Sequence, residues 1–237
     1  MKIKRFYLCL VLLLLFGLFG CYNTKNNYKI ENVEEALESF RSYSKFDMTY
    51  TLNISTLDIT IMNNMKVDYS GIKPKAIKNI RYGNYTSTTY YVNGYECYAS
   101  GDIYNVSPKE FDMFEDVPFP TFDFDEMEYH LSAKKTTDKI IYTVKVTGMD
   151  LKTIIEDIFY QSTGNMDVVE IELEVVAFKE KDNLDEFTIS FTLTEDGESA
   201  DVEMVCKFNA VDENVEVTIP SDLYDQIEQY SNPNNEP

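Results

Sequence analysis

The chain has 237 residues, of which 21 are basic and 41 are acidic, so its formal net charge at pH 7 is −20. Because neutralisation of phosphates by basic side chains dominates affinity for nucleic acids, this charge argues against a nucleic-acid partner. Anionic lipid headgroups would also repel such a surface, so attachment to a membrane would need another source of affinity.

The first 20 residues have the organisation of a secretory signal peptide. Lys2–Arg5 holds three basic residues, and an apolar run of about 14 residues, Phe6–Phe19, follows it. This run is shorter than the roughly 20 residues with which a helix crosses a bilayer. We therefore predict that residues 1–20 are a cleaved leader. Since the leader contains no acidic residue, its removal would change the net charge from −20 to −23.

The end of the leader, Leu18-Phe19-Gly20-Cys21, resembles the lipobox of bacterial lipoproteins, in which the cysteine becomes the lipid-modified first residue. An ordinary signal peptide with a chance cysteine is the alternative. The polar stretch that follows at once favours the lipobox, because residues 21–29 would suit a tether between a membrane and a folded domain. We therefore predict acylation of Cys21, palmitate included, and a location at the extracytoplasmic face of the cell membrane. Stable anchoring takes at least two acyl chains or signals, and a diacylated or triacylated cysteine meets this requirement.

Two short helices are predicted before residue 115. Asn32 and Glu35 have the spacing of a capping box, and one face of the helix behind them is apolar: Val33, Ala36, Leu37 and Phe40. Ser107–Glu110 offers an N-cap, a first-turn proline and a capping glutamate, so we predict a second helix there that carries Phe111 and Phe114.

The strongest helical pattern follows Asp150, which would cap it. Apolar residues recur there at positions i, i+3, i+4, i+7 and i+8, namely Leu151, Ile154, Ile155, Ile158 and Phe159. The helix must end by Gly164. A further short turn is expected after Ser221.

Nearly all of the remaining chain alternates between apolar and polar residues, which is typical of antiparallel strands with one wet and one apolar face. The alternation is clearest in four stretches: 46–54, 169–175, 187–193 and 215–219. Asn93-Gly94 is a strong type I′ hairpin signal, and Asp196-Gly197 divides another pair of strands. Residues 134–139 and 181–186 are polar breaks of hairpin-loop size.

These patterns predict an α+β fold that is mainly antiparallel β, with nine to eleven strands. One large curled sheet, a half-barrel with the helices packed on its concave face, accounts for both the strands and the helices. We expect a single domain over residues 30–230 and a disordered tail over 231–237.

The order of elements resembles the LolA/LppX-like superfamily of bacterial lipoproteins. A capped helix leads into an alternating strand, Tyr91-Val92-Asn93-Gly94-Tyr95 makes a hairpin, a long amphipathic helix interrupts the sheet, and the last alternating stretch ends at Pro220. The resemblance covers about residues 30–225. It implies an incomplete β-barrel with helices in its mouth. Characterised members hold lipid or lipoprotein acyl chains between sheet and helices, which implies a hydrophobic cavity here.

Two functions fit these features. In the first, the domain binds a lipid or another hydrophobic small molecule between sheet and helices, in a cavity lined by Met48, Tyr50, Leu52, Ile171, Leu173, Leu151, Ile155 and Phe159. In the second, the helices fill the interior and the domain binds another envelope protein through a patch of Tyr90, Tyr91 and Tyr95. Tyrosine suits a cavity rim or an interface, but a plain sheet surface explains a tyrosine-rich hairpin as well.

The sequence offers little for catalysis, and we expect neither enzymatic activity, nor a cofactor, nor a metal site. His130 is the only histidine and is predicted to face solvent from a strand, and no nucleophile elbow or phosphate-binding loop is present. Asp123–Glu128 could offer oxygen ligands to calcium, but a solvated acidic face explains it as well. Cys97 and Cys206 could pair in an oxidising compartment, although two free buried thiols are favoured.

Overall fold

A computed structural model describes residues 28–100, 103–112, 124–147, 151–159, 167–179, 183–212 and 215–231. The predicted leader, Cys21 and most of the tether lie outside these residues, as do Asp150, Gly164 and residues 232–237. Tyr28, two residues before the predicted domain boundary at residue 30, already packs against the core. The ring of Tyr28 meets that of Tyr142 edge-on, with 5.6 Å between their centroids.

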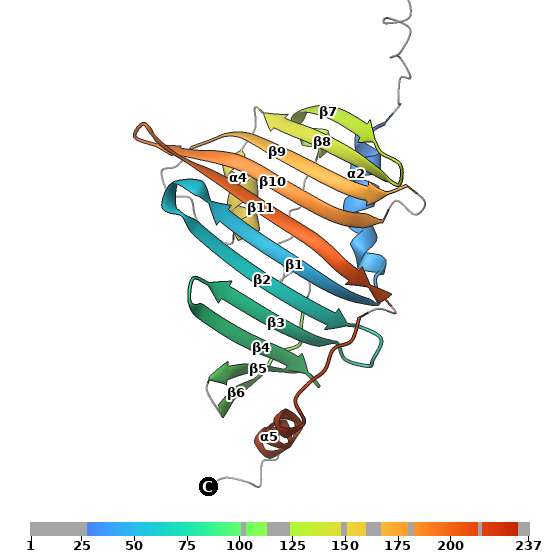
Figure 1. The fold of residues 1–237 in the computed structure, drawn as a ribbon, viewed down its shortest axis with the longest axis vertical. Helices are drawn as coiled ribbons and strands as arrows, with labels where there is room; N and C mark the ends of the chain where they lie inside the picture. Colours follow the sequence, from blue (N-terminus) through green and yellow to red (C-terminus); the bar gives the residue numbers. More distant parts are fainter. Residues whose placement is uncertain are drawn as a thin grey trace, which may run out of the picture.

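Strands make up most of the described chain. Their bounds are β1 Lys45–Ile54, β2 Ile59–Asp68, β3 Lys75–Tyr82, β4 Tyr85–Val92, β5 Tyr95–Ser100, β6 Ile103–Pro108, β7 Glu128–Lys135, β8 Lys139–Thr147, β9 Asp167–Phe178, β10 Leu184–Glu195 and β11 Glu198–Val211. All belong to one 11-stranded antiparallel sheet in the order β6-β5-β4-β3-β2-β1-β11-β10-β9-β8-β7 (Figure 1). Strands β1 to β6 and strands β7 to β11 each pair in sequence order, and β1 pairs with β11 to join the two halves. The sheet is unclosed, as predicted for a half-barrel, with β6 and β7 at its edges.

The hairpins follow the predicted turn chemistry. Asn93 and Gly94 have φ angles of 57° and 85°, and Asp196 and Gly197 have φ angles of 50° and 88°. Both pairs therefore adopt the left-handed conformations that a two-residue type I′ turn requires, which asparagine, aspartate and glycine tolerate best. The turns set the strand register, and the register sets which side chains face each side of the sheet.

Two helices lie on the inner face of the sheet, behind it in Figure 1, and pack on β9 and β10. They are α2, Ile30–Glu38, which continues into the 3-10 helix η1, Ser39–Ser42, and α4, Leu151–Phe159. The predicted apolar faces are buried, with Val33, Ala36, Leu37 and Phe40 from the first and Leu151, Ile154 and Ile155 from the second. The predicted start of the first helix was wrong. Asn32 lies inside α2, where its side-chain oxygen accepts a hydrogen bond from the Lys29 N–H at 3.0 Å.

The predicted helix does not begin at Ser107, because the described residues 109–112 are not helical and residues 103–108 form β6. Its partners in β5 place Glu96 opposite Ser107 and Tyr95 opposite Pro108. An edge strand tolerates Pro108, since a proline lacks only the N–H that would face solvent. Lys109 then donates its N–H to the Gly94 carbonyl oxygen at 3.0 Å, and Phe111 is buried although it is in no helix. Phe114 lies outside the described residues.

The prediction of a last strand over residues 215–219 is also wrong. The segment is extended and unpaired, and it buries Val215 while exposing Glu216 and Thr218. Its alternation therefore does not mark a hydrogen-bonded ladder, although Ile219 packs against a hydrophobic cluster of the outer face. It leads to α5, Ser221–Ser231, a full helix where only a short turn was expected and which takes in Ser231 from the predicted tail.

Helix α5 packs on the face opposite α2 and α4, which corrects the prediction that all helices lie on the concave side. It buries Leu223 and Ile227 against the outward side chains of β4 to β6 in a second hydrophobic cluster, which also holds Val92, Cys97, Tyr90, Tyr95, Tyr104, Val106, Ile219 and Tyr224. Figure 1 shows the segment before α5 running on the near side of the sheet, past the ends of β2 to β4, whereas α2 and α4 lie behind the sheet.

Candidate functional site

The inner face of β8 to β11 and β1 is an almost continuous apolar surface, here called the apolar sector. Every second residue along these strands points inward, and the inward side chains are buried on each strand. They include Tyr142, Val144, Leu173, Val175, Phe187, Ile189, Met204, Cys206, Phe46 and Met48. The twelve residues of β9 and of β10 supply its centre, directly under α2 and α4.

The structure brings together most of the residues predicted to line a cavity. Six of them are buried in one hydrophobic cluster, namely Met48, Leu52, Ile171, Leu173, Leu151 and Ile155. Tyr50 is half-buried and packs against the same cluster. Burial raises the pKa of Tyr50 to about 12. The side chain of Phe159 lies outside the described residues. That these residues contact a ligand stays a prediction.

One end of the inner face is packed with aromatic rings. Successive ring centroids lie 5.3 to 6.5 Å apart along a row from β4 to η1 that consists of Tyr91, Phe111, Tyr69, Phe46, Phe208 and Tyr43. Aromatic pairs at such distances contribute about 0.5–1.5 kcal/mol beyond the burial of their area. Outside this row, a polar network joins the same strand ends.

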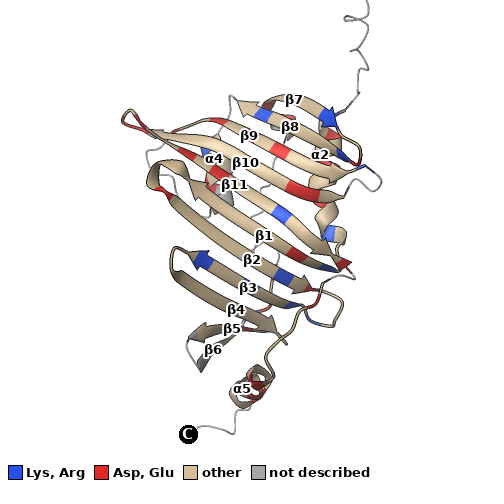
Figure 2. Cartoon of the chain, viewed as in Figure 1, with Lys and Arg blue, Asp and Glu red and all other residues tan. Residues whose placement is uncertain are grey.

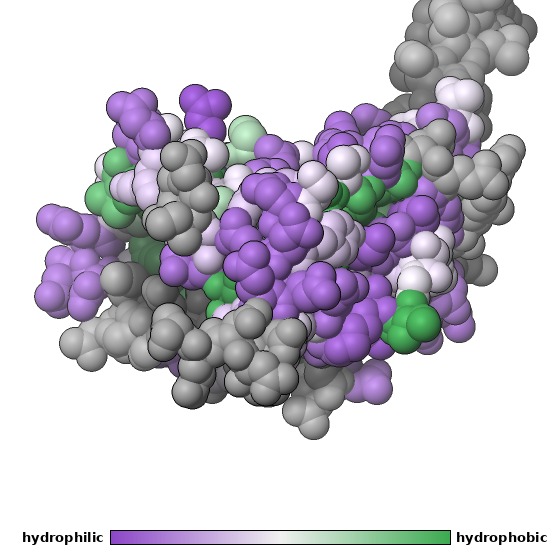
Figure 3. All heavy atoms as spheres, turned by 90° about the horizontal axis from the view of Figure 1, so that it is seen from below, coloured by the Kyte–Doolittle hydropathy of each residue, from purple (hydrophilic) through white to green (hydrophobic). Residues whose placement is uncertain are grey.

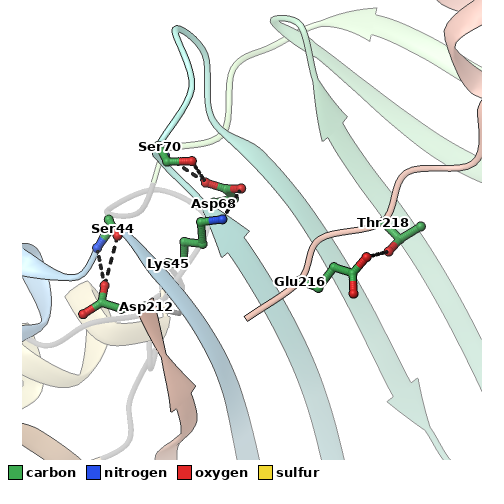
Figure 4. Close-up of polar contacts among 7 residues, drawn as sticks. All are labelled: Ser44, Lys45, Asp68, Ser70, Asp212, Glu216 and Thr218. Carbon is green, nitrogen blue, oxygen red and sulfur yellow. Dashed lines mark hydrogen bonds and ion pairs between the residues drawn. The ribbon is translucent and has the colours of Figure 1, made fainter. Parts of the chain in front are cut away.

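That polar network is drawn in Figure 4. Asp212 accepts hydrogen bonds from the N–H and the hydroxyl of Ser44, both at 3.0 Å. Asp68 accepts from the N–H and hydroxyl of Ser70 and pairs with Lys45 at 3.1 Å. Partial burial raises the pKa of Asp68, but the Ser70 hydrogen bonds and Lys45 outweigh it and lower the pKa overall. The start of β1 is thereby tied to the ends of β2 and β11.

The opposite end of the inner face is less covered. Five apolar side chains there are only partly buried against the core, namely Tyr50, Ile54, Ile61, Val168 and Leu193. They lie near the β1–β2 and β10–β11 turns. The apolar sector thus runs from a closed aromatic end to an end with half-buried side chains.

The inner face changes character from β2 to β5, a region here called the polar sector. The register places Asn63 opposite Tyr50 and Ile80, and Ile80 opposite Ser87. It likewise places Lys78 opposite Thr89 and Thr89 opposite Tyr98. Directly opposed residues of antiparallel strands project from the same face, so all of these side chains share the inner face with Met48. Asn63, Ser87 and Thr89 are 6%, 7% and 9% exposed.

These buried polar residues were not predicted from the sequence. The signal was present, because counting alternate positions back from the Asn93-Gly94 turn puts Thr89 and Ser87 on the same face as Tyr91. Asn63 was masked by its polar neighbour Asn64, which interrupts the apolar alternation.

The tyrosines divide between the two faces and do not form the predicted exposed patch. Tyr91 is 2% exposed on the inner face, where its hydroxyl donates to Glu96 at 2.9 Å. Tyr90 and Tyr95 are half-buried on the outer face beneath α5. The exposed tyrosines of this region are others, namely Tyr82, Tyr85 and Tyr98.

Tyr85 and Tyr98 form a hydroxyl pair at the rim of the polar sector. Their oxygens lie 2.6 Å apart. This hydrogen bond raises the pKa of Tyr85 and lowers the pKa of Tyr98, and a hydrogen bond with Ser87 lowers both. The pair therefore extends the hydrogen-bonding surface of Ser87 to the solvent.

The outer face of the sheet carries carboxylates and lysines in ion pairs, such as Lys66 with Asp47 and Lys207 with Glu186. Figure 2 shows how acidic and basic residues are distributed along the strands. A hollow of 450 Å³ lies there between β1, β9, β10 and β11 and is lined by four carboxylates, Glu170, Glu172, Asp201 and Glu203. Lys145 pairs with two of them, at 3.5 Å from Glu170 and 2.8 Å from Glu172. Seen from the β6 end, the surface is largely hydrophilic, with small separate apolar patches (Figure 3).

The other predicted features can now be placed. His130 is exposed on β7, as expected. Cys97 and Cys206 are free and buried in different clusters, so the disulfide alternative is wrong. Within the described ranges no group of His, Cys, Asp or Glu could hold a metal ion.

The acidic segment considered for calcium is described only from residue 124 onward. There Asp125 is exposed and Phe124 is buried in the 3-10 helix η3, Phe124–Glu126. No helix among the described residues is long and apolar enough to cross a bilayer.

Comparison with known proteins identifies the fold. No family model and no curated protein matches the sequence. The Mycobacterium tuberculosis lipoprotein LppX superposes with a TM-score of 0.51 over 80% of this chain and 97% of its own, at 10% identity. The chain has a LolA/LppX-like fold. Lower TM-scores are found for LprF from Mycobacterium bovis (0.48, 10% identity, 81% and 95% covered) and a LolA superfamily protein from Nitrosomonas europaea (0.28, 9% identity, 82% and 96% covered).

Proposed function

We propose that this chain is a membrane-anchored extracytoplasmic lipoprotein, without enzymatic activity, that binds a lipid-like molecule between the inner face of its sheet and α2 and α4. The observation that carries the proposal is the apolar sector. The five strands of this sector, at about 4.8 Å spacing, span roughly 19 Å, whereas a helix of nine residues is only about 13 Å long. Neither helix alone spans the sector, so the chains of a ligand would lie beside and beneath the two helices.

Two features support the anchor. The segment Leu18-Phe19-Gly20-Cys21 ends an apolar leader and is followed by a polar stretch, and the structurally similar LppX is a lipoprotein. The net charge of −20 makes electrostatic attraction to anionic lipids an implausible alternative to acyl chains.

The absence of tryptophan from the chain gives a direct test of ligand binding. Tyr50→Trp would place the only indole on the inner face at the border of the apolar sector. We expect a fatty acid brominated on its chain to quench this fluorescence at saturable, low concentration. Tyr230→Trp, on the exposed side of α5, is the matched control and should be quenched weakly and without saturation. Equal quenching of both variants, or none, would rule out the inner face as the binding site.

The anchor is tested separately. Cys21→Ser should abolish incorporation of labelled palmitate and leave the leader uncleaved at that site. Cys97→Ser, which removes a buried thiol of the folded domain, should leave labelling unchanged. Full palmitate labelling of Cys21→Ser would contradict the anchor but not the ligand.

A further inference from the structure

We propose that the polar sector, Asn63, Lys78, Ser87 and Thr89, binds the headgroup of an amphipathic lipid, and that this headgroup carries hydroxyl groups. The acyl chains would then extend along the apolar sector towards β9 and α4. This inference rests on the proposed function and adds to it the chemical class and the orientation of the ligand.

The first support is the division of one continuous face into two kinds of surface. From β8 to β1 the inward side chains are apolar, and Met48 lies opposite Met65 at the border. One strand further, Lys78 lies opposite both Met65 and Thr89, and Asn63 and Ser87 flank Ile80. The inward residues of β2 to β4 at the aromatic end, Val67, Ala76 and Tyr91, still belong to the apolar core. The polar residues Asn63, Lys78, Ser87 and Thr89 therefore form a local hydrogen-bonding region beside an apolar surface, as an amphipathic molecule would require.

The second support is an unpaired acceptor. Asn63 Oδ1 is buried and has no hydrogen-bond partner, and Asn63 is 6% exposed. Buried polar atoms nearly always have partners, so each exception requires an explanation. An unpaired acceptor needs a donor. A headgroup with several hydroxyls can donate from one of them to Asn63 and accept with others from Ser87 or Thr89, whereas an ionised carboxylate or phosphate brings acceptors only.

The third support is access. Tyr85 and Tyr98 are on the inner face by register and are 55% and 36% exposed. Their paired hydroxyls contact Ser87. A headgroup that enters at this rim would replace its hydrogen bonds to water first with bonds to the two tyrosine hydroxyls, then to Ser87 and finally to Asn63. Lys78 adds donors to the site that hydroxyl oxygens can accept, and the net charge of −20 disfavours the approach of a free anionic ligand.

The test compares two probes with the same acyl chain, 1-monopalmitoylglycerol and palmitate, in equilibrium binding to the full chain. We expect the wild type to bind monopalmitoylglycerol more tightly. Asn63→Leu, which has a similar volume but no acceptor, should weaken monopalmitoylglycerol binding about tenfold and leave palmitate binding nearly unchanged, as expected for one lost hydrogen bond. Met65→Leu, at the next inward position of β2, is the control and should affect neither probe.

Asn63→Leu should also raise the melting temperature of the ligand-free chain, because it removes an unpaired buried acceptor. Thr89→Val tests the same sector independently and should reduce the preference for monopalmitoylglycerol. If both probes bind but neither variant changes the preference, or if palmitate binds more tightly, the headgroup assignment is wrong and the proposed lipid binding stands. If neither probe binds to the wild type or to any variant, the proposed function fails and the headgroup site with it.

Discussion

The hydroxyl of Tyr43 donates a hydrogen bond to the carbonyl oxygen of Leu184, 2.9 Å away. The N–H of Leu184 in turn donates to the Ser39 hydroxyl oxygen at 2.8 Å. Two side chains from the segment that follows α2 therefore satisfy both backbone groups of the first residue of β10. This contact fastens the helical cover to the sheet, and burial raises the pKa of Tyr43.

We predict that Tyr43→Phe lowers the free energy of unfolding by about 1–3 kcal/mol, because it leaves the buried Leu184 carbonyl without its partner. Urea denaturation of both proteins would measure the change. Tyr230→Phe, which removes a hydroxyl from an exposed ring, should alter stability by less than about 0.5 kcal/mol. Identical midpoints for wild type and Tyr43→Phe would show that this bond does not hold the cover in place.

The apolar sector is tested by a pair of substitutions in β9. Leu173 is fully buried on the inner face, so Leu173→Ala should cost about 2–5 kcal/mol through lost burial and the cavity left behind. Val169, in the same strand, is 63% exposed, and Val169→Ala should cost less than about 0.5 kcal/mol. Comparable losses in chemical denaturation would contradict the assignment of the inner face.

The packing of α5 on the outer face predicts how Cys97 reacts. Cys97 and Leu223 are both fully buried in the second cluster, and burial raises the pKa of the Cys97 thiol to about 11. Leu223→Ala should loosen α5 and speed labelling of Cys97 by a thiol reagent about tenfold or more, since about 1.4 kcal/mol corresponds to a factor of ten. Glu228→Ala, on the exposed side of α5, should leave the rate unchanged. Peptide mapping would show whether Cys206 stays protected, and equal labelling of both thiols would indicate global unfolding instead.

The buried thiols and phenol also predict a loss of stability at alkaline pH. Burial raises the pKa of Tyr50 from 10.0 to about 12 and that of Cys97 from 9.0 to about 11, and it also raises the pKa of Cys206. The unfolded chain releases these protons at lower pH than the folded chain, so the stabilisation is complete below the unfolded pKa values and is lost as pH rises through the folded ones. The urea midpoint should fall steadily between about pH 9 and about pH 12. Tyr50→Phe should reduce the slope in the upper part of this range, and a flat profile would contradict the burial of these groups.

The alternation of side chains and the turn residues were sufficient to predict the half-barrel. Asn93-Gly94 and Asp196-Gly197 can only be turns of this kind, and they bracket strands with clear inner and outer faces. Two segments were misread for the same reason, which is that local pattern does not reveal pairing. Pro108 reads as the first turn of a helix unless β5 is known to lie beside it, and Val215 alternates as a strand would although no strand pairs with it.

The candidate site divides in the same way. Its apolar members, such as Leu173 and Ile155, were predictable because they repeat with the period of their strand or helix. Asn63 was not, since a polar residue on the buried face breaks the pattern from which the face is inferred, and only the register with Tyr50 and Ile80 restores its position. Sites that depart from the general pattern of a fold are where sequence periodicity is least informative.

Native mass spectrometry of the full chain purified from its own host tests the central claim, that a lipid-like molecule occupies the space between the inner face and α2 and α4. We predict one non-covalently bound, acyl-containing molecule per chain, released intact by collisional activation and absent after denaturation, when only the mass of the covalent anchor remains. A native mass equal to that of the denatured, anchored chain, with no released molecule, would contradict the account.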